Sequence, residues 1–151
     1  MLRVILYEMI LIICCVYALA RGGAPERSAA AMMLVASLAS FATQSQPFSG
    51  SFLKMQMWVF VIDMLLLVGL FVLAVVSTRF WPLWLAGLQL LAVVAHFIRA
   101  VDQSALPRGY QFLISFEAYP MLLLVALGAW RHRRRLQLFG VDRSWRDSSS
   151  L

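Results

Sequence analysis

The stretch Met57–Ser77, MWVFVIDMLLLVGLFVLAVVS, decides the fold of this protein. Its 21 residues include one charged side chain, Asp63, and no proline. A helix rises 1.5 Å per residue, so a helix of this length covers about 30 Å, the thickness of the hydrocarbon core of a bilayer. The stretch therefore predicts a transmembrane helix.

Other apolar runs extend this prediction to the whole chain. Leu83–Val101 and Gln111–Trp130 have the length and composition of spans, and Val4–Ala20 is predicted to span although it is near the lower length limit. Ala29–Thr43 is shorter and only moderately apolar, so it either spans or lies partly in the interface. We predict an all-α protein, a polytopic transmembrane helical bundle with five spans, or four as the alternative.

Composition places the chain in the same class. Hydrophobic residues make up 62% of the 151 residues and charged residues 13%, a balance typical of lipid-embedded chains. The length predicts one domain, a bundle over residues 1–130 followed by a basic tail over 131–151. Six of the thirteen basic residues lie in this tail. Membrane topology therefore explains the net charge of +6, and no nucleic-acid partner is predicted.

The first apolar run, Val4–Ala20, has two features that need interpretation. Arg3, the apolar run after it and Ala18-Leu19-Ala20 are also typical of a cleaved secretory signal. Glu8 is unusual in a signal core, so we interpret the run as a retained helix. The adjacent thiols of Cys14 and Cys15 are predicted to be buried structural residues.

Basic residues predict the orientation. Arg131, Arg133, Arg134 and Arg135 follow the last span directly, which favours a cytoplasmic C-terminus in a membrane of the bacterial inner-membrane type. Five spans place nine basic residues inside and three outside, whereas four spans give eight and four. The four arginines are also predicted to bind the headgroups of anionic lipids.

Ionisable residues inside the predicted spans collect at one depth. With five spans, all of them lie within about 10 Å of the extracytoplasmic face. Glu8 belongs to this layer only if Ala29–Thr43 crosses the membrane. The members of the layer are Glu8, Asp63, His96, Arg99 and Glu117.

The fourth predicted span carries a polar stripe. Gln89, His96, Arg99 and Gln103 are spaced at i, i+7, i+10 and i+14 and so share one helical face. Asp102 follows Arg99 at i+3, close enough to pair with it. The stripe is predicted to face the bundle interior or a partner protein, with Arg99 and His96 pairing with the acids of the layer.

Two interpretations of the layer remain open. In the first, the polar groups satisfy one another and fix the packing of the helices. In the second, they form a site open to the outer side for a proton, a metal cation, a lipid headgroup or a small polar ligand. Pro120 favours a site, because its ring removes the hydrogen bond to the Phe116 carbonyl beside Glu117.

The sequence contains no catalytic motif and implies no cofactor, so no enzyme activity is predicted. His96 is the one histidine inside a predicted span and the one candidate metal ligand of that type there. We expect a non-enzymatic accessory or assembly subunit of a larger membrane complex, in contact with other membrane subunits or with copies of itself. The alternative is a homo-oligomeric transporter or channel linked to protons or cations, and an enzyme acting on lipid or quinone comes third.

Overall fold

Five helices make up the part of the chain that the computed structural model describes, residues 2–45, 52–101, 107–142 and 145. Side chains are described for residues 5–43, 57–98, 117–142 and 145. Within these ranges there is an isolated antiparallel bridge, between Ser77 and Trp145, and no strand. The prediction of an all-helical protein is confirmed. The helices are α1 (Leu2–Arg21), α2 (Ala24–Ser45), α3 (Phe52–Val76), α4 (Trp81–Val101) and α5 (Pro107–Phe139).

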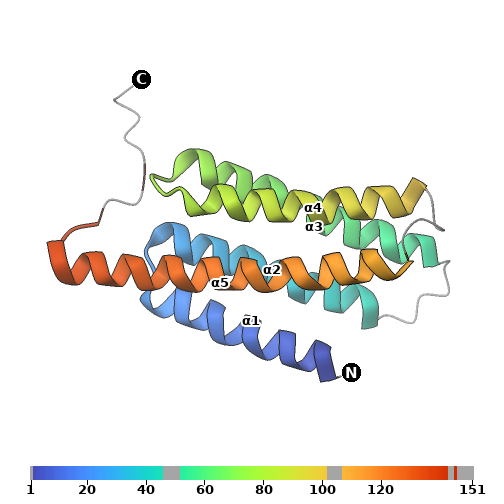
Figure 1. The fold of residues 1–151 in the computed structure, drawn as a ribbon, viewed down its shortest axis with the longest axis horizontal. Helices are drawn as coiled ribbons and strands as arrows, with labels where there is room; N and C mark the ends of the chain where they lie inside the picture. Colours follow the sequence, from blue (N-terminus) through green and yellow to red (C-terminus); the bar gives the residue numbers. More distant parts are fainter. Residues whose placement is uncertain (1, 46–51, 102–106, 143–144, 146–151) are drawn as a thin grey trace.

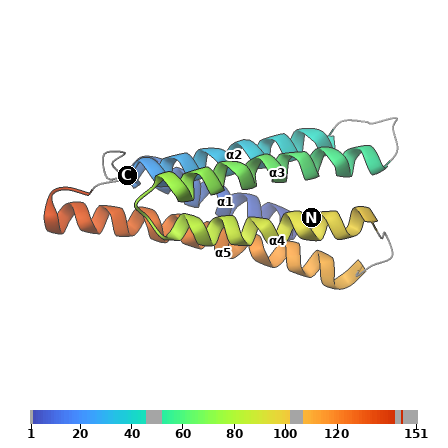
Figure 2. The same cartoon turned by 90° about the horizontal axis from the view of Figure 1, so that it is seen from above.

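The helices lie side by side along the long axis of the molecule, and successive helices run in opposite directions (Figure 1). Each helix packs against the next one in the chain, and α5 packs against α1 as well as α4, which closes a ring (Figure 2). One end of the ring holds the α1–α2 and α3–α4 turns together with the end of α5. We call it the turn end, and the opposite end, where α1 begins, the N-terminal end.

Glycine and proline determine where α1 stops and α2 starts. The Gly22 N–H donates to the Ala18 carbonyl at 2.8 Å, and the Gly23 carbonyl accepts from the Arg27 N–H at 3.0 Å. Pro25 lies in the first turn of α2, where a missing N–H costs nothing. Helix α2 has 22 residues, whereas the apolar run alone predicted about fifteen.

The interior of the bundle is mainly apolar and is built by all five helices. Small residues such as Ala18, Ala29 and Ala30 are completely buried, which lets the helix backbones approach closely. The other residues of the hydrophobic core fill the space between the helices: Leu11, Cys15, Met33, Leu70, Leu73, Leu85, Ala86, Met121, Leu122, Val125 and Ala129.

The outward faces of the helices are apolar too. Considering the described residues alone, two segments are long and apolar enough to cross a membrane, Met57–Val76 of α3 and Trp81–Ile98 of α4. The five-span topology therefore remains a prediction. Exposed large side chains on these two helices include Val61, Leu65, Val68, Phe71, Val72, Leu83, Trp84, Leu90, Leu91 and Phe97.

Helix α5 is the longest, with 33 residues, and extends nine residues beyond Trp130. The first part of the predicted basic tail is thus helical. Pro120 lies inside this helix, so the Phe116 carbonyl receives no hydrogen bond from residue 120.

Candidate functional site

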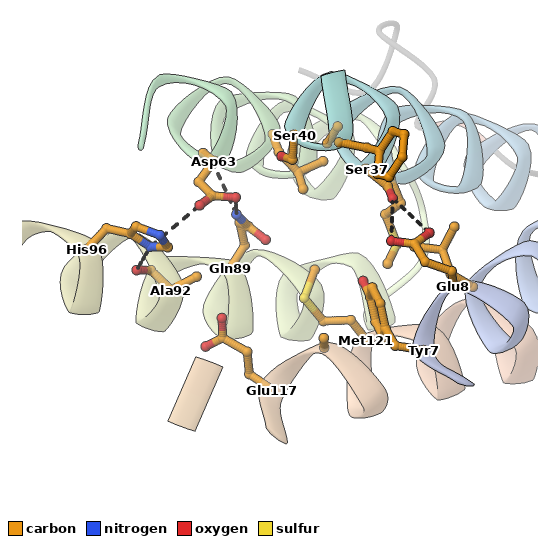
Figure 3. Close-up of a pocket in the computed structure, with 16 residues that line it drawn as sticks. Tyr7, Glu8, Ser37, Ser40, Asp63, Gln89, Ala92, His96, Glu117 and Met121 are labelled. Carbon is orange, nitrogen blue, oxygen red and sulfur yellow. Dashed lines mark hydrogen bonds and ion pairs between the residues drawn. The ribbon is translucent and has the colours of Figure 1, made fainter. Parts of the chain in front are cut away.

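A cavity of about 280 Å³ lies inside the ring, and every helix contributes to its wall. The residues come from the halves of the helices nearer the N-terminal end. Figure 3 shows polar side chains from different helices pointing into one space. The polar part of the lining consists of Tyr7, Glu8, Ser37, Ser40, Asp63, Gln89, His96 and Glu117.

Asp63 is held by the polar stripe of α4. Gln89 Nε2 donates to Asp63 Oδ1 at 3.2 Å and to the Asp63 carbonyl at 3.3 Å. His96 Nδ1 lies 3.5 Å from Asp63 Oδ2, but it is closer to the Ala92 carbonyl, at 3.0 Å. We therefore interpret the Ala92 contact as the hydrogen bond of Nδ1 and the Asp63 contact as electrostatic.

Glu117 is buried, with 7% of its surface exposed. Its Oε2 is inaccessible to solvent and has no hydrogen-bond partner among the described residues. The Phe116 carbonyl, which receives no hydrogen bond from Pro120, lies one residue away in the same turn of α5. An unpartnered acid oxygen in an apolar interior is costly, and a bound donor or cation would reduce that cost.

Glu8 joins the cavity because α2 runs the full length of the bundle between α1 and α3. Ser37 Oγ donates to both carboxylate oxygens of Glu8, at 3.3 Å to Oε1 and 3.2 Å to Oε2. The Tyr7 ring packs edge-on against Tyr119 of α5, with the centroids 5.9 Å apart.

The structure thus brings together four ionisable members of the predicted layer, Glu8, Asp63, His96 and Glu117, and adds Gln89 from the stripe. The Arg99 side chain lies outside the described residues, as do Asp102 and Gln103 in full. The proposed pairing of Arg99 with an acid of the layer therefore stays a prediction.

Potential metal ligands and thiols lie within the described ranges. No three His, Cys, Asp or Glu side chains there are placed to hold a metal ion together. Cys15 is buried and Cys14 half-buried, and both are free thiols.

The turn end holds a second polar cluster, which the sequence did not predict. The carboxylate of Asp142, just beyond α5, forms an ion pair with Arg79 of the α3–α4 turn. It also lies 2.6 Å from His132 Nδ1 and 3.3 Å from Arg135 Nε. At 1.5 Å per residue, His132 lies about 22 Å from Glu117 along α5.

Glu26 of α2 is fully buried beside this cluster, and neither carboxylate oxygen has a partner among the described side chains. A Cβ on Gly23 would be 2.9 Å from both Glu26 Oε2 and His132 Nδ1. A Cβ on Gly128 would be 3.2 Å from Trp81 Nε1, another buried atom with no partner among the described residues. A side chain at either glycine would therefore force its neighbours among these three side chains to move.

The arginines after Trp130 differ in their surroundings. Arg131 and Arg133 are exposed, and Arg134 lies over the Trp130 ring, 5.4 Å from its centroid. Arg135 is half-buried because it pairs with Asp142. The exposed arginines suit the predicted contact with lipid headgroups, whereas Arg135 stabilises the turn end.

Asp142 attaches the C-terminal segment, the residues that follow Phe139, to the turn end through its contacts with Arg79, His132 and Arg135. This attachment depends on pH. Burial alone would raise the pKa of Asp142, but hydrogen bonds with Arg79 and His132 and the charges of Arg79 and Arg135 outweigh burial and lower the pKa. A lowered folded-state pKa gives stabilisation that is complete above the ordinary carboxyl value of 3.8 and is lost as pH falls through the lowered pKa.

We predict that Asp142→Asn releases this segment at pH 7. Removing one partner of a buried ion pair should lower the ratio of attached to released C-terminal segment at least tenfold, which corresponds to about 1.4 kcal/mol. A nitroxide label on Val141→Cys, at an exposed position, would report the release as increased mobility of the label. In the protein that retains Asp142, the label should become mobile only at pH values below about 4. Arg133→Gln, also at an exposed position, is the control and should change nothing. An immobile label in Asp142→Asn would contradict the prediction.

Comparison with known proteins finds no relative of this chain. No protein-family model matches it, and no curated protein or solved structure matches it.

Proposed function

We propose that this chain is a five-span helical membrane protein that binds a cation in its acidic cavity and works as a cation-linked transporter or channel. In this proposal the membrane is of the bacterial inner-membrane type. The turn end and the C-terminal segment face the cytoplasm, and the cavity lies in the extracytoplasmic half.

The distribution of polar side chains supports a lipid environment. Large apolar side chains cover the outward faces of α1, α3 and α4, whereas Glu26, Gln89 and Glu117 are buried inside the ring. This arrangement reverses the usual one of water-soluble proteins and suits a bundle surrounded by lipid. The arginines of α5, beyond its apolar part, suit the positive-inside rule.

The observation that carries the cation proposal is that Glu117 Oε2, a buried acid oxygen, has no hydrogen-bond partner among the described residues. It lines a cavity that also contains the carboxyl groups of Glu8 and Asp63, and no arginine or lysine is among the described lining residues. A purely structural polar layer would be expected to satisfy its own acids. Three carboxyl groups around an internal space instead attract positive charge.

Flux through reconstituted protein tests this function. Liposomes that contain a pH-sensitive dye and the purified protein would be given inward gradients of sodium, potassium or methylammonium in turn. We expect at least one gradient to change the internal pH or the cation content several-fold faster than in protein-free liposomes. No difference from protein-free liposomes with any of these cations, or with a proton gradient alone, would refute the transport proposal.

A second candidate function has its own support, an accessory or assembly role in a larger complex. An apolar groove of about 910 Å³ runs between α3 and α4, and its lining includes Phe71, Trp84 and Gly87. A Cβ on Gly87 would meet nothing within 4 Å, so a partner helix has room to approach. Stoichiometric co-purification with another membrane protein, lost in Gly87→Leu, would favour this function.

A further inference from the structure

The acids of the cavity form two separate groups. Glu8, with its hydrogen bond from Ser37, stands at one end, and Asp63 and Glu117 stand at the other. Figure 3 shows the two groups apart, with the side chains of Met121 and Tyr7 drawn between them. The absence of any metal-binding group among the described residues agrees with acids that do not converge on one point.

Apolar side chains form much of the cavity wall, alongside the hydroxyl groups of Tyr7 and Ser40. Leu11, Met33, Leu66 and Met121 contribute aliphatic and thioether surface there, and Phe41 adds an aromatic ring. Such a surface offers no hydrogen bonds to a hydrated inorganic ion, but it packs well against methylene groups. The volume of about 280 Å³ is several times the ~30 Å³ that one water molecule occupies in the liquid.

This arrangement selects among cations by shape. A compact metal ion would contact one acidic end and leave the other end without a cation. An ammonium group has three N–H donors, which suits a carboxylate with an open oxygen such as Glu117 Oε2. A ligand with one ammonium at each tip and methylenes between them matches both ends and the apolar wall together.

We propose that the cavity binds a linear aliphatic diamine as its dication, with one ammonium at Glu8 and the other at Asp63 and Glu117. This inference rests on the proposed function, because it names the class of cation that the same cavity takes. The apolar wall contacts the methylene chain, and the fixed separation of the acidic ends sets the preferred chain length.

Calorimetric titration of the purified protein tests the proposal. The probes are α,ω-diamines with three to six carbons, and the controls are n-alkyl monoamines of matched length. We expect one diamine length to bind best, at least tenfold more tightly than its matched monoamine. Glu8→Gln should bring the affinity for the best diamine down to that for its matched monoamine, whereas Glu117→Gln should weaken the binding of both.

The outcomes separate this inference from the function on which it rests. Equal affinity for diamines and monoamines at every length overturns the diamine proposal but leaves cation binding intact. Flux of inorganic cations without any amine binding also overturns the diamine proposal alone. If neither amines nor inorganic cations bind or move, the proposed function fails and the inference fails with it. The chain-length profile of the wild type decides the question even if Glu8→Gln does not fold.

Discussion

Glu117→Gln is expected to abolish cation-dependent flux and to weaken cation binding about 30-fold or more. Loss of one member of a buried charge pair typically costs about 2 kcal/mol or more, and each 1.4 kcal/mol is a factor of ten in affinity. The measurements are flux in liposomes and calorimetric titration with methylammonium. Asp142→Asn is the matched control, because it neutralises an acid about 20 Å away at the turn end and should leave both properties unchanged.

The stability of Glu117→Gln distinguishes a ligand site from a structural layer. Glutamine keeps the size of the side chain, and the Oε2 that it replaces has no partner among the described residues. The variant should therefore melt at the wild-type temperature or above it. A variant that melts well below the wild type and still binds cations normally would show that Glu117 serves packing alone.

Gly22→Ala is expected to destabilise the bundle by about 1–3 kcal/mol, the range for overpacking in a tight core. A Cβ at Gly22 would collide with the Ala18 carbonyl oxygen and lie 2.6 Å from Glu26 Cβ. The first obstacle is backbone, which cannot rotate away as a long side chain does. The α1–α2 turn would have to open, and Glu26 and the neighbouring Gly23 would shift with it.

Thermal unfolding in detergent measures this effect, with Gly87→Ala as the control. A Cβ on Gly87 would meet nothing within 4 Å, and alanine is favoured over glycine inside a helix by about 0.5–1 kcal/mol. The control should be neutral or slightly stabilising. Equal melting temperatures for the two variants would mean that the α1–α2 turn has room for a methyl group and is not tightly packed.

Depth and helical periodicity brought the ionisable residues of the cavity lining to one level, but they did not identify most of its other residues. Asp63, His96 and Glu117 lie on long apolar runs, so counting residues along each helix placed them at one level. The membership of Glu8 depended on whether Ala29–Thr43 crosses the membrane, which hydropathy left open because this run is short and only moderately apolar. Helix α2 begins at Ala24 and includes Glu26, whose burial the sequence does not indicate.

The turn end was not predictable in the same way. Arg79, His132 and Asp142 come from the α3–α4 turn, from α5 and from the segment after it. Their meeting depends on how far α5 extends past Trp130 and on the return of the chain beyond Gly140, which has φ 70°. The one local signal was the Gly22-Gly23 pair before Pro25 and Glu26, which indicates only a helix break.

The measurement closest to the central claim is equilibrium binding of radiolabelled methylammonium to the purified protein. The comparison is between the wild type and a variant that combines Glu8→Gln, Asp63→Asn and Glu117→Gln, with correct folding checked by circular dichroism and gel filtration. We predict saturable binding to the wild type, displaced by the best diamine, and none to the variant. Equal binding to both proteins, or no saturable binding of any monovalent cation to the wild type, would contradict the claim that this cavity is a cation site.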